Sequence, residues 1–89
     1  MTPEIKIYEL GLINFKSLKD FITDNSIEED FMILLNLHDF ENLLLEYLNI
    51  YGCSWEFPFP YLGINFSEDI YNKVKRRELG IIEIEDFDN

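Results

Sequence analysis

The chain has very few residues of the kinds that build covalent or phosphate-binding sites. Cys53 is the sole cysteine, so a disulfide within the chain and a cysteine-based zinc site are both excluded. A single thiol favours a reducing compartment, and we expect Cys53 to be a small buried apolar residue. The four glycines stand alone at positions 11, 52, 63 and 80, which excludes a glycine-rich phosphate loop.

Long hydrophobic runs are also missing. The longest is five residues, 31–35, whereas a membrane-spanning helix needs about 20. The N-terminus has no basic region followed by an apolar run, so no signal peptide is predicted. We therefore expect a soluble, cytoplasmic protein. Ala and Gln are absent while Ile and Asn are abundant, a bias typical of AT-rich genomes such as those of low-GC bacteria, phages and mobile elements.

Positive charge is scarce and unevenly placed. Eighteen acidic residues against seven Lys and Arg give a formal charge of -11. Residues 20–72 contain no Lys or Arg and eleven carboxylates, and four bases then fall together at Lys73, Lys75, Arg76 and Arg77. This pattern predicts an acidic body with one small basic spot, which repels nucleic acid and anionic membrane and attracts basic protein surfaces. The alternative is that the acidity only keeps a small protein soluble.

Large apolar side chains are plentiful, with eight Phe, twelve Ile and twelve Leu, and they suffice for the core of one domain spanning 1–89. Alternation predicts a first strand over 4–10. A helix follows, capped by Asn14 or Ser17, with Phe15, Leu18, Phe21 and Ile22 on one stripe and its end at 23–26.

Residues 26–37 fit two structures. Ser26 and Glu29 have the spacing of a helix capping box, yet 31–35 is a continuous apolar run typical of a buried strand, which we favour. A helix capped by Asp39 then presents an apolar stripe from Phe40 to Tyr51 and ends at Gly52. Leu45 lies off that stripe, exposed or covered by another element.

The C-terminal third predicts two strands with a third helix between them. Residues 62–66 and 79–85 alternate like strands, and 67–79 starts at a capping serine, carries its bases in the last turns and stops at Gly80. Because the apolar stripe of 67–79 is thin, a charged loop between two hairpin strands is the alternative. The expected fold is α+β, with about four strands in a mostly antiparallel sheet packed by two or three helices, in the order strand–helix–strand–helix–strand–helix–strand.

The stretch 55–63, WEFPFPYLG, concentrates aromatic rings and prolines. In an extended chain Trp55, Phe57, Phe59 and Tyr61 share one face, and two prolines remove amide donors from one edge. This predicts an edge strand that pairs on one side only, with a bulge or bend near 61–63 where the apolar set changes face. The rings either cover the core or form a contact site.

The sequence contains few candidate catalytic residues. His38 neighbours Asp39, but no nucleophile accompanies them, and a helix separates His38 from Cys53, so we interpret His38 as a turn residue that helps to cap the helix. Asp86 and Asp88 have the spacing of calcium ligands with nothing after them. We therefore predict no enzyme activity, no cofactor and no metal. The bases at 73–77 end a helix or lie in a solvated loop, or else contact an acidic patch on a partner or a second copy.

These exclusions leave a protein that acts by contact. We expect a small acidic inhibitor or immunity-type protein, encoded by a phage or mobile element, that masks a basic surface of a nuclease or another nucleic-acid-binding protein. The chain shares its size, acidity and lack of catalytic groups with phage anti-defence and toxin-immunity proteins, although no motif assigns it to a family. The expected partner-binding residues are Trp55, Glu56, Phe57, Tyr61, Glu28, Glu29 and Asp30. The alternative is a structural or accessory subunit, for example of a virion, whose aromatic strand is buried on assembly. A homodimer is a further alternative.

Overall fold

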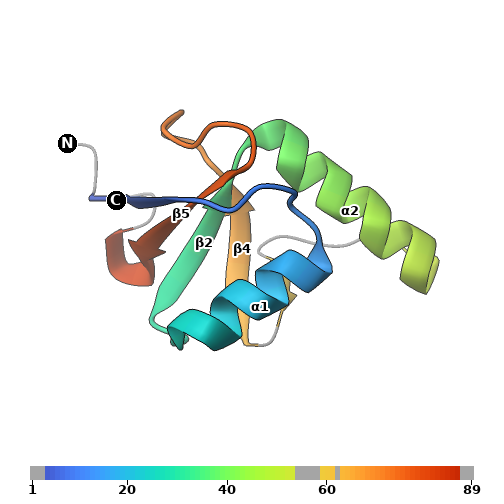
Figure 1. Ribbon diagram of the computed structural model, residues 1–89, viewed down its shortest axis with the longest axis horizontal. Helices are drawn as coiled ribbons and strands as arrows, with labels where there is room; N and C mark the ends of the chain where they lie inside the picture. The colour runs from blue at the N-terminus through green and yellow to red at the C-terminus, as the bar shows by residue number, and fades with distance from the viewer. Residues whose placement is uncertain (1–3, 54–58, 62, 87–89) are drawn as a thin grey trace.

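The chain folds around a five-stranded mixed sheet with two helices on one side (Figure 1). The computed structural model describes residues 4–53, 59–61 and 63–86. The elements are β1 (Lys6–Glu9), α1 (Phe15–Asn25), β2 (Phe31–Leu35), α2 (Leu37–Tyr51), β3 (Phe59–Tyr61), β4 (Ile64–Glu68), β5 (Glu78–Glu83) and the 3-10 turn η1 (Ile84–Asp86). The strand order is β1-β5-β2-β4-β3, and β2–β4 is the parallel pair while the other three pairings are antiparallel. The predicted α+β class and mostly antiparallel sheet are confirmed.

Both predicted helices before Gly52 are present. Asn14 caps α1 and forms a capping box with Ser17, while Gly52 ends α2 in the left-handed conformation, at φ 74°. The cap of α2 was predicted wrongly: Asn36 caps it, through its side-chain oxygen and the His38 amide. Asp39 lies inside the first turn, which frees its carboxylate for contacts outside the helix.

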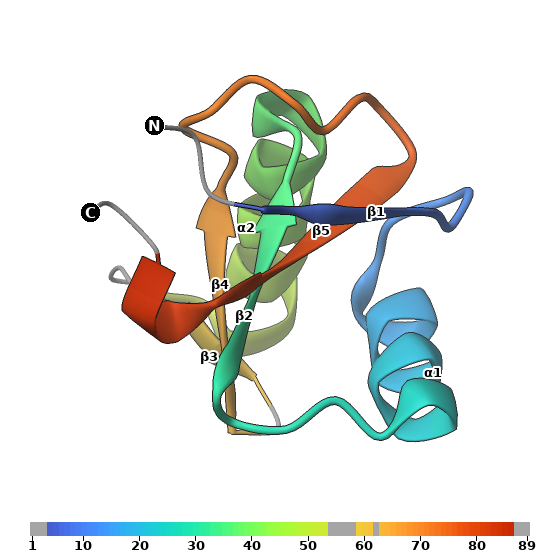
Figure 2. The same ribbon diagram turned by 90° about the vertical axis from the view of Figure 1, so that its left-hand side faces the viewer.

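The central strand, β2, is buried on both of its faces. Ile33 and Leu35 face the helices, within a core that includes Leu18, Phe40 and Phe66. Met32 and Leu34 point to the opposite face, where Val74 and Ile82 pack against them and Ile5 and Tyr71 lie alongside. Figure 2 shows α2 behind the sheet and the segment before β5 arching over its upper end. Burial on both sides explains why 31–35 is apolar without alternation, and it confirms the strand that we favoured.

The predicted third helix at 67–79 is wrong. Ser67 and Glu68 belong to β4, and residues 69–77 form a loop that leads into β5, so Gly80 lies inside a strand instead of ending a helix. This loop does not join a hairpin either, because β2 lies between β4 and β5. We call residues 69–77 the basic loop, since they contain Lys73, Lys75, Arg76 and Arg77. Five strands replace the expected four, because the chain turns back at Gly63, at φ 80°, between β3 and β4.

Polar side chains hold the first part of the basic loop by its backbone. The Asp69 carboxylate accepts hydrogen bonds from the amides of Tyr71 (2.9 Å), Lys73 and Val74 (2.6 Å). The Asn36 side-chain amide donates to the Val74 carbonyl at 3.1 Å. These bonds satisfy backbone groups that would otherwise need water, and they place Val74 over the sheet.

The end of the loop is held by the buried carboxylate of Asp39, which is 4% exposed. Its two oxygens accept from the Arg77 amide at 2.7 Å and from Arg76 Nε at 2.9 Å. The Arg77 carbonyl in turn accepts from the amides of Leu10 and Gly11, at 2.9 and 3.0 Å. Arg77 therefore keeps a left-handed conformation, φ 68°, which is uncommon for a residue other than glycine. Asp39 thus links α2, the basic loop and the segment after β1.

Gly80 allows the covering residues to approach the sheet closely. A Cβ at this position would lie 2.7 Å from Ile5 Cγ2 and 3.0 Å from Val74 Cγ2. We expect Gly80→Ala to lower the free energy of unfolding by about 1–3 kcal/mol through overpacking, measured by urea denaturation. Because Ile5→Ala removes one of the clashing atoms, the double variant should lose less than the sum of the two single losses. Additive losses would show that the close approach is not the cause.

Asp39→Ala tests the link to the basic loop. We expect a loss of about 2–3 kcal/mol in the free energy of unfolding, since a partly buried amide and a guanidinium lose a carboxylate acceptor. Arg76→Ala is the matched control and should cost below about 1 kcal/mol, because the Arg76 side chain is 55% exposed and Asp39 still accepts from Arg77. Equal losses in the two variants would contradict a role for Asp39 as the anchor of the loop backbone.

Candidate functional site: an acidic pocket beside Phe31

Four acidic residues lie around one surface cavity at the end of the sheet where β2 begins and β5 ends. Glu29, Asp30, Glu83 and Glu85 line a surface cavity of about 380 Å³ together with Phe31 and Ile84, and we call these six residues the acidic pocket. The antiparallel pairing of Phe31 with Glu83 brings the two segments together, and the Ile84 amide donates to the Asp30 carbonyl at 2.9 Å. A cavity with an apolar floor and an acidic rim is therefore fixed by the sheet register.

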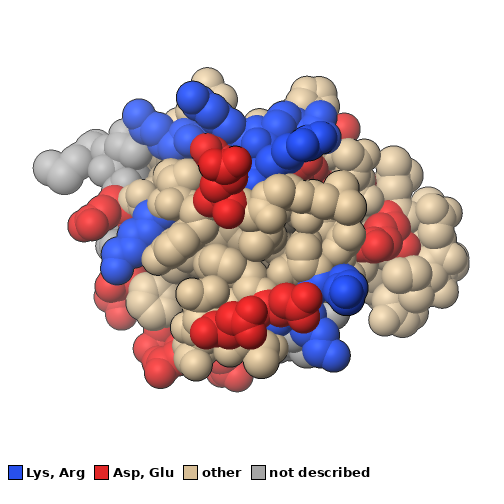
Figure 3. All heavy atoms as spheres, in the orientation of Figure 1, with Lys and Arg blue, Asp and Glu red and all other residues tan. Residues whose placement is uncertain are grey.

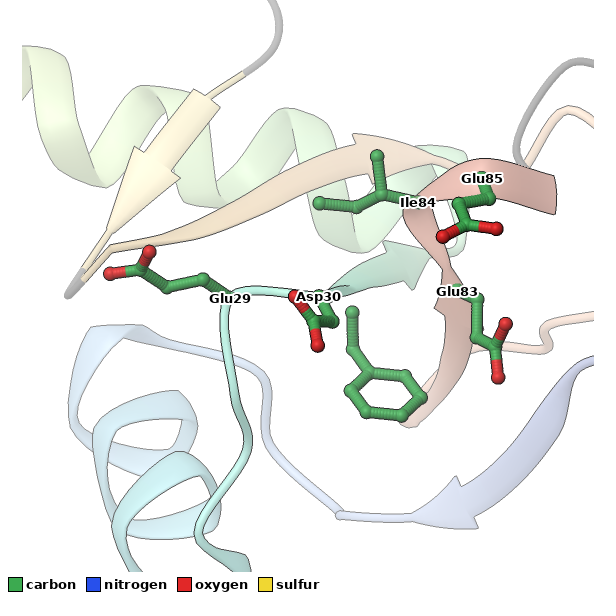
Figure 4. Close-up of a pocket in the computed structure, with 6 residues that line it drawn as sticks. Glu29, Asp30, Glu83, Ile84 and Glu85 are labelled. Atoms are coloured by element: carbon green, nitrogen blue, oxygen red, sulfur yellow. The ribbon is translucent and has the colours of Figure 1, made fainter.

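The side chains of the pocket come from two sides. In Figure 4, Glu29 and Asp30 lie on the segment that enters β2, while Glu83 and Glu85 lie on the segment that leaves β5. Glu29 extends toward the β3–β4 turn, where its carboxylate lies beside Gly63. Among the described residues, no hydrogen bond or ion pair engages the carboxylates of Asp30 and Glu83. These charges are thus available to a ligand.

The apolar floor extends beyond this one cavity. Half-buried Phe31 also lines two neighbouring cavities, which share Lys6 and Ile81 and reach Glu4 and Glu28 respectively. Lys6 is the cation on this side and partly offsets the acidic residues there. The surface around Phe31 therefore combines an aromatic ring with negative charge, a combination that suits the long stem and charged end of Lys or Arg.

Three of the seven expected partner-binding residues fall at this surface. Glu29 and Asp30 line the acidic pocket itself, and Glu28 borders the neighbouring cavity. Trp55, Glu56 and Phe57 lie outside the described residues. Tyr61 is placed in β3, which pairs with β4 at the edge of the sheet, so the predicted edge strand is confirmed over 59–61. The side chain of Tyr61 is not among those described, and the choice between core cover and contact site stays open for the aromatic row.

Sequence reasoning missed Phe31, Glu83 and Glu85 as members of the site. Glu83 and Glu85 lie more than fifty residues after Asp30, and they reach it because β5 runs antiparallel to β2. The alternation at 81–85 predicts a strand but does not say which strand is its neighbour. A signal was available in Phe31, since it is the one residue of the apolar run 31–35 that follows directly on three acids.

The basic loop occupies the opposite end of β2 and β5. Lys73, Lys75, Arg76 and Arg77 are all exposed, while Val74 between them is 4% exposed and packs on the sheet. Figure 3 shows Lys and Arg side chains gathered along the upper edge of the molecule, over the segment that precedes β5 in Figure 1. The predicted basic spot therefore lies at the end of β5 opposite the acidic pocket, with Asp69 and Glu78 beside its bases, and it lies in a loop, not at the end of a helix.

The residues considered for catalysis lie far apart. His38 is exposed in the first turn of α2, and Cys53 follows the far end of the same helix. Cys53 is exposed, so the predicted buried position is wrong; it lies beside Tyr47, whose pKa is raised by burial and by a hydrogen bond with the Cys53 thiol. Within the described residues, no group of three His, Cys, Asp or Glu side chains is arranged to hold a metal ion.

Comparisons with known proteins assign no relative to this chain. No helix in the described part of the chain combines the length and the apolar character that crossing a membrane requires. Protein-family models, curated proteins and solved structures were compared with the chain, and none matches it.

Proposed function

We propose that this protein binds a basic surface of another protein through the acidic pocket, and thereby masks that surface. The observation that carries the proposal is a cavity lined by Glu29, Asp30, Glu83 and Glu85 together with Phe31. A cluster of carboxylates is costly to assemble, because like charges repel, and it is favourable when a partner supplies bases. The overall charge of -11 adds long-range attraction for such a partner.

The geometry favours a protein ligand over a free cation. Hard metal ions need several oxygen ligands around one point, and no such group is found in the described residues. Phe31 instead offers a ring face next to the carboxylates, so an arginine or lysine can place its stem on the ring and its charge among the acids. On this proposal the protein is an inhibitor or immunity-type protein of a phage or mobile element, which acts in the host cytosol on a nuclease or another nucleic-acid-binding protein.

A short Lys- and Arg-rich peptide provides the direct test, with affinity measured by titration calorimetry on dilute protein. We expect Asp30→Lys/Glu83→Lys (D30K/E83K) to weaken binding at least about tenfold, because two attractions become repulsions at the pocket. Asp20→Lys/Asp24→Lys (D20K/D24K) on exposed positions of α1 is the control, since it changes the net charge equally. We expect it to weaken binding by less than about threefold. Equal losses would mean that the peptide senses net charge alone, which would contradict the proposed site.

A second test addresses the class of target. Wild-type protein and D30K/E83K serve as matched immobilised baits for a bacterial lysate, and the retained fractions are assayed for nuclease activity with and without added soluble protein. We expect basic proteins to be retained by the wild type only, to be released by salt, and to include a nuclease activity that the wild type suppresses. Retention of the same proteins on both baits, or undiminished nuclease activity, would refute the masking role. Retention that salt does not release would favour the accessory-subunit alternative, in which apolar surface drives assembly.

A further inference from the structure

The basic loop presents its charges outward from a fixed backbone. In the stretch 73–75 the buried Val74 faces the sheet, and the exposed Lys73 and Lys75 flank it on the solvent side. Arg76 is partly neutralised by Asp39, whereas no ion pair within the described residues engages Lys73, Lys75 or Arg77. The side chains of Lys73, Lys75 and Arg77 are therefore available to a ligand outside the chain.

The loop is too far from the acidic pocket to neutralise it within one molecule. The two lie at opposite ends of β5, whose six residues at about 3.3 Å each separate them by roughly 17 Å. That distance is about twice the screening length of 8 Å at physiological ionic strength. The bases of the loop, which lie beside Asp69 and Glu78, are therefore not neutralised by the acidic pocket of the same molecule and are complementary to the pocket of a second one.

We propose that the basic loop docks on the acidic pocket of a second copy of this chain. Lys73, Lys75 and Arg77 then face the carboxylates of Asp30 and Glu83, and the stem of one base packs on Phe31 of the other copy. The inference rests on the proposed role of the acidic pocket as a site for basic ligands. It identifies a ligand for that pocket within the chain's own sequence.

The net charge of -11 does not prevent this contact at physiological salt. The repulsion between two copies falls off over the screening length, whereas each loop base would lie within a few ångströms of a pocket carboxylate, so the contact is expected to be weak and to depend on salt. A nucleic acid is the less favoured occupant of the loop, because four bases neutralise few phosphates and the acidic body lies next to them. A contact between unlike surfaces closes a two-fold dimer where it forms twice, and otherwise extends into a chain of molecules.

Sedimentation equilibrium at physiological salt, from micromolar to millimolar protein, tests the proposal with charge reversals. We expect Lys73→Glu/Lys75→Glu (K73E/K75E) to raise the dissociation constant for self-association at least about tenfold. Lys16→Glu/Lys19→Glu on the exposed side of α1 is the control, because it changes the net charge by the same amount. We expect it to change the dissociation constant by less than about threefold. For the pocket, D30K/E83K is the test variant and D20K/D24K is its control. Circular dichroism establishes that each variant is folded.

A mixture of the two charge-reversal variants gives the most direct test of the loop-to-pocket contact. K73E/K75E and D30K/E83K should each be monomeric alone and should associate when combined, because both loop-to-pocket contacts between them are again complementary. A wild type that stays monomeric at millimolar concentration, an equal loss in the α1 control, or variants that fail to associate when mixed would overturn the proposal. So would an oligomer insensitive to salt, or an oligonucleotide that binds monomeric wild type and not K73E/K75E. Peptide binding separates the two hypotheses, since K73E/K75E keeps its acidic pocket and should bind the basic peptide as the wild type does.

Discussion

The buried carboxylate of Asp39 is the contact on which the rest of the arrangement depends. It lies within the first turn of α2 and holds the backbone and side chain at the end of the basic loop. Because Arg77 also accepts hydrogen bonds from the segment after β1, one side chain connects three parts of the chain. With that end fixed, and with Asp69 and Asn36 holding the other, Val74 can cover Met32 and Leu34. Neither α1 nor α2 covers the second face of the sheet, and Val74 and Tyr71 of this loop cover it together with Ile5.

The same constraint separates the charges of the molecule. A loop that carries four bases must cross the end of β2, and β5 then runs away from it and ends among acids. Because of this strand direction, the basic loop and the acidic pocket lie at opposite ends of β5. Since the two ends are separated by about twice the screening length, neither weakens the other's field, and each can select its own partner.

Much of the fold could be predicted from the sequence because the signals were local. Asn14, Ser17 and Gly52 lie within a few residues of the ends that they fix, and 31–35 reads as a buried strand. The helix predicted at 67–79 failed because Ser67 and the acids and bases after it imitate helix-end signals, while the true partners of the loop, Asn36 and Asp39, lie more than thirty residues away. For the same reason Glu29 and Asp30 could be proposed as partner-binding residues from the sequence, whereas strand pairing was needed to place Glu83 and Glu85 at the same cavity. Long-range pairing decides both cases, and a single sequence does not display it.

A pocket that recognises bases mainly through charge needs a further source of selectivity, because every basic surface in a cell competes for it. On the proposals made above, the basic loop of a second copy supplies that selectivity. A weak contact of a few charges keeps the pocket occupied at high protein concentration, and only a ligand that gains more than this contact displaces it. Such a ligand must reach past the carboxylates to the ring of Phe31 and the exposed side chain of Ile84, since burial of apolar surface adds free energy that charge pairs near water do not. The fit to the apolar floor, more than the number of bases, then determines which basic protein is bound.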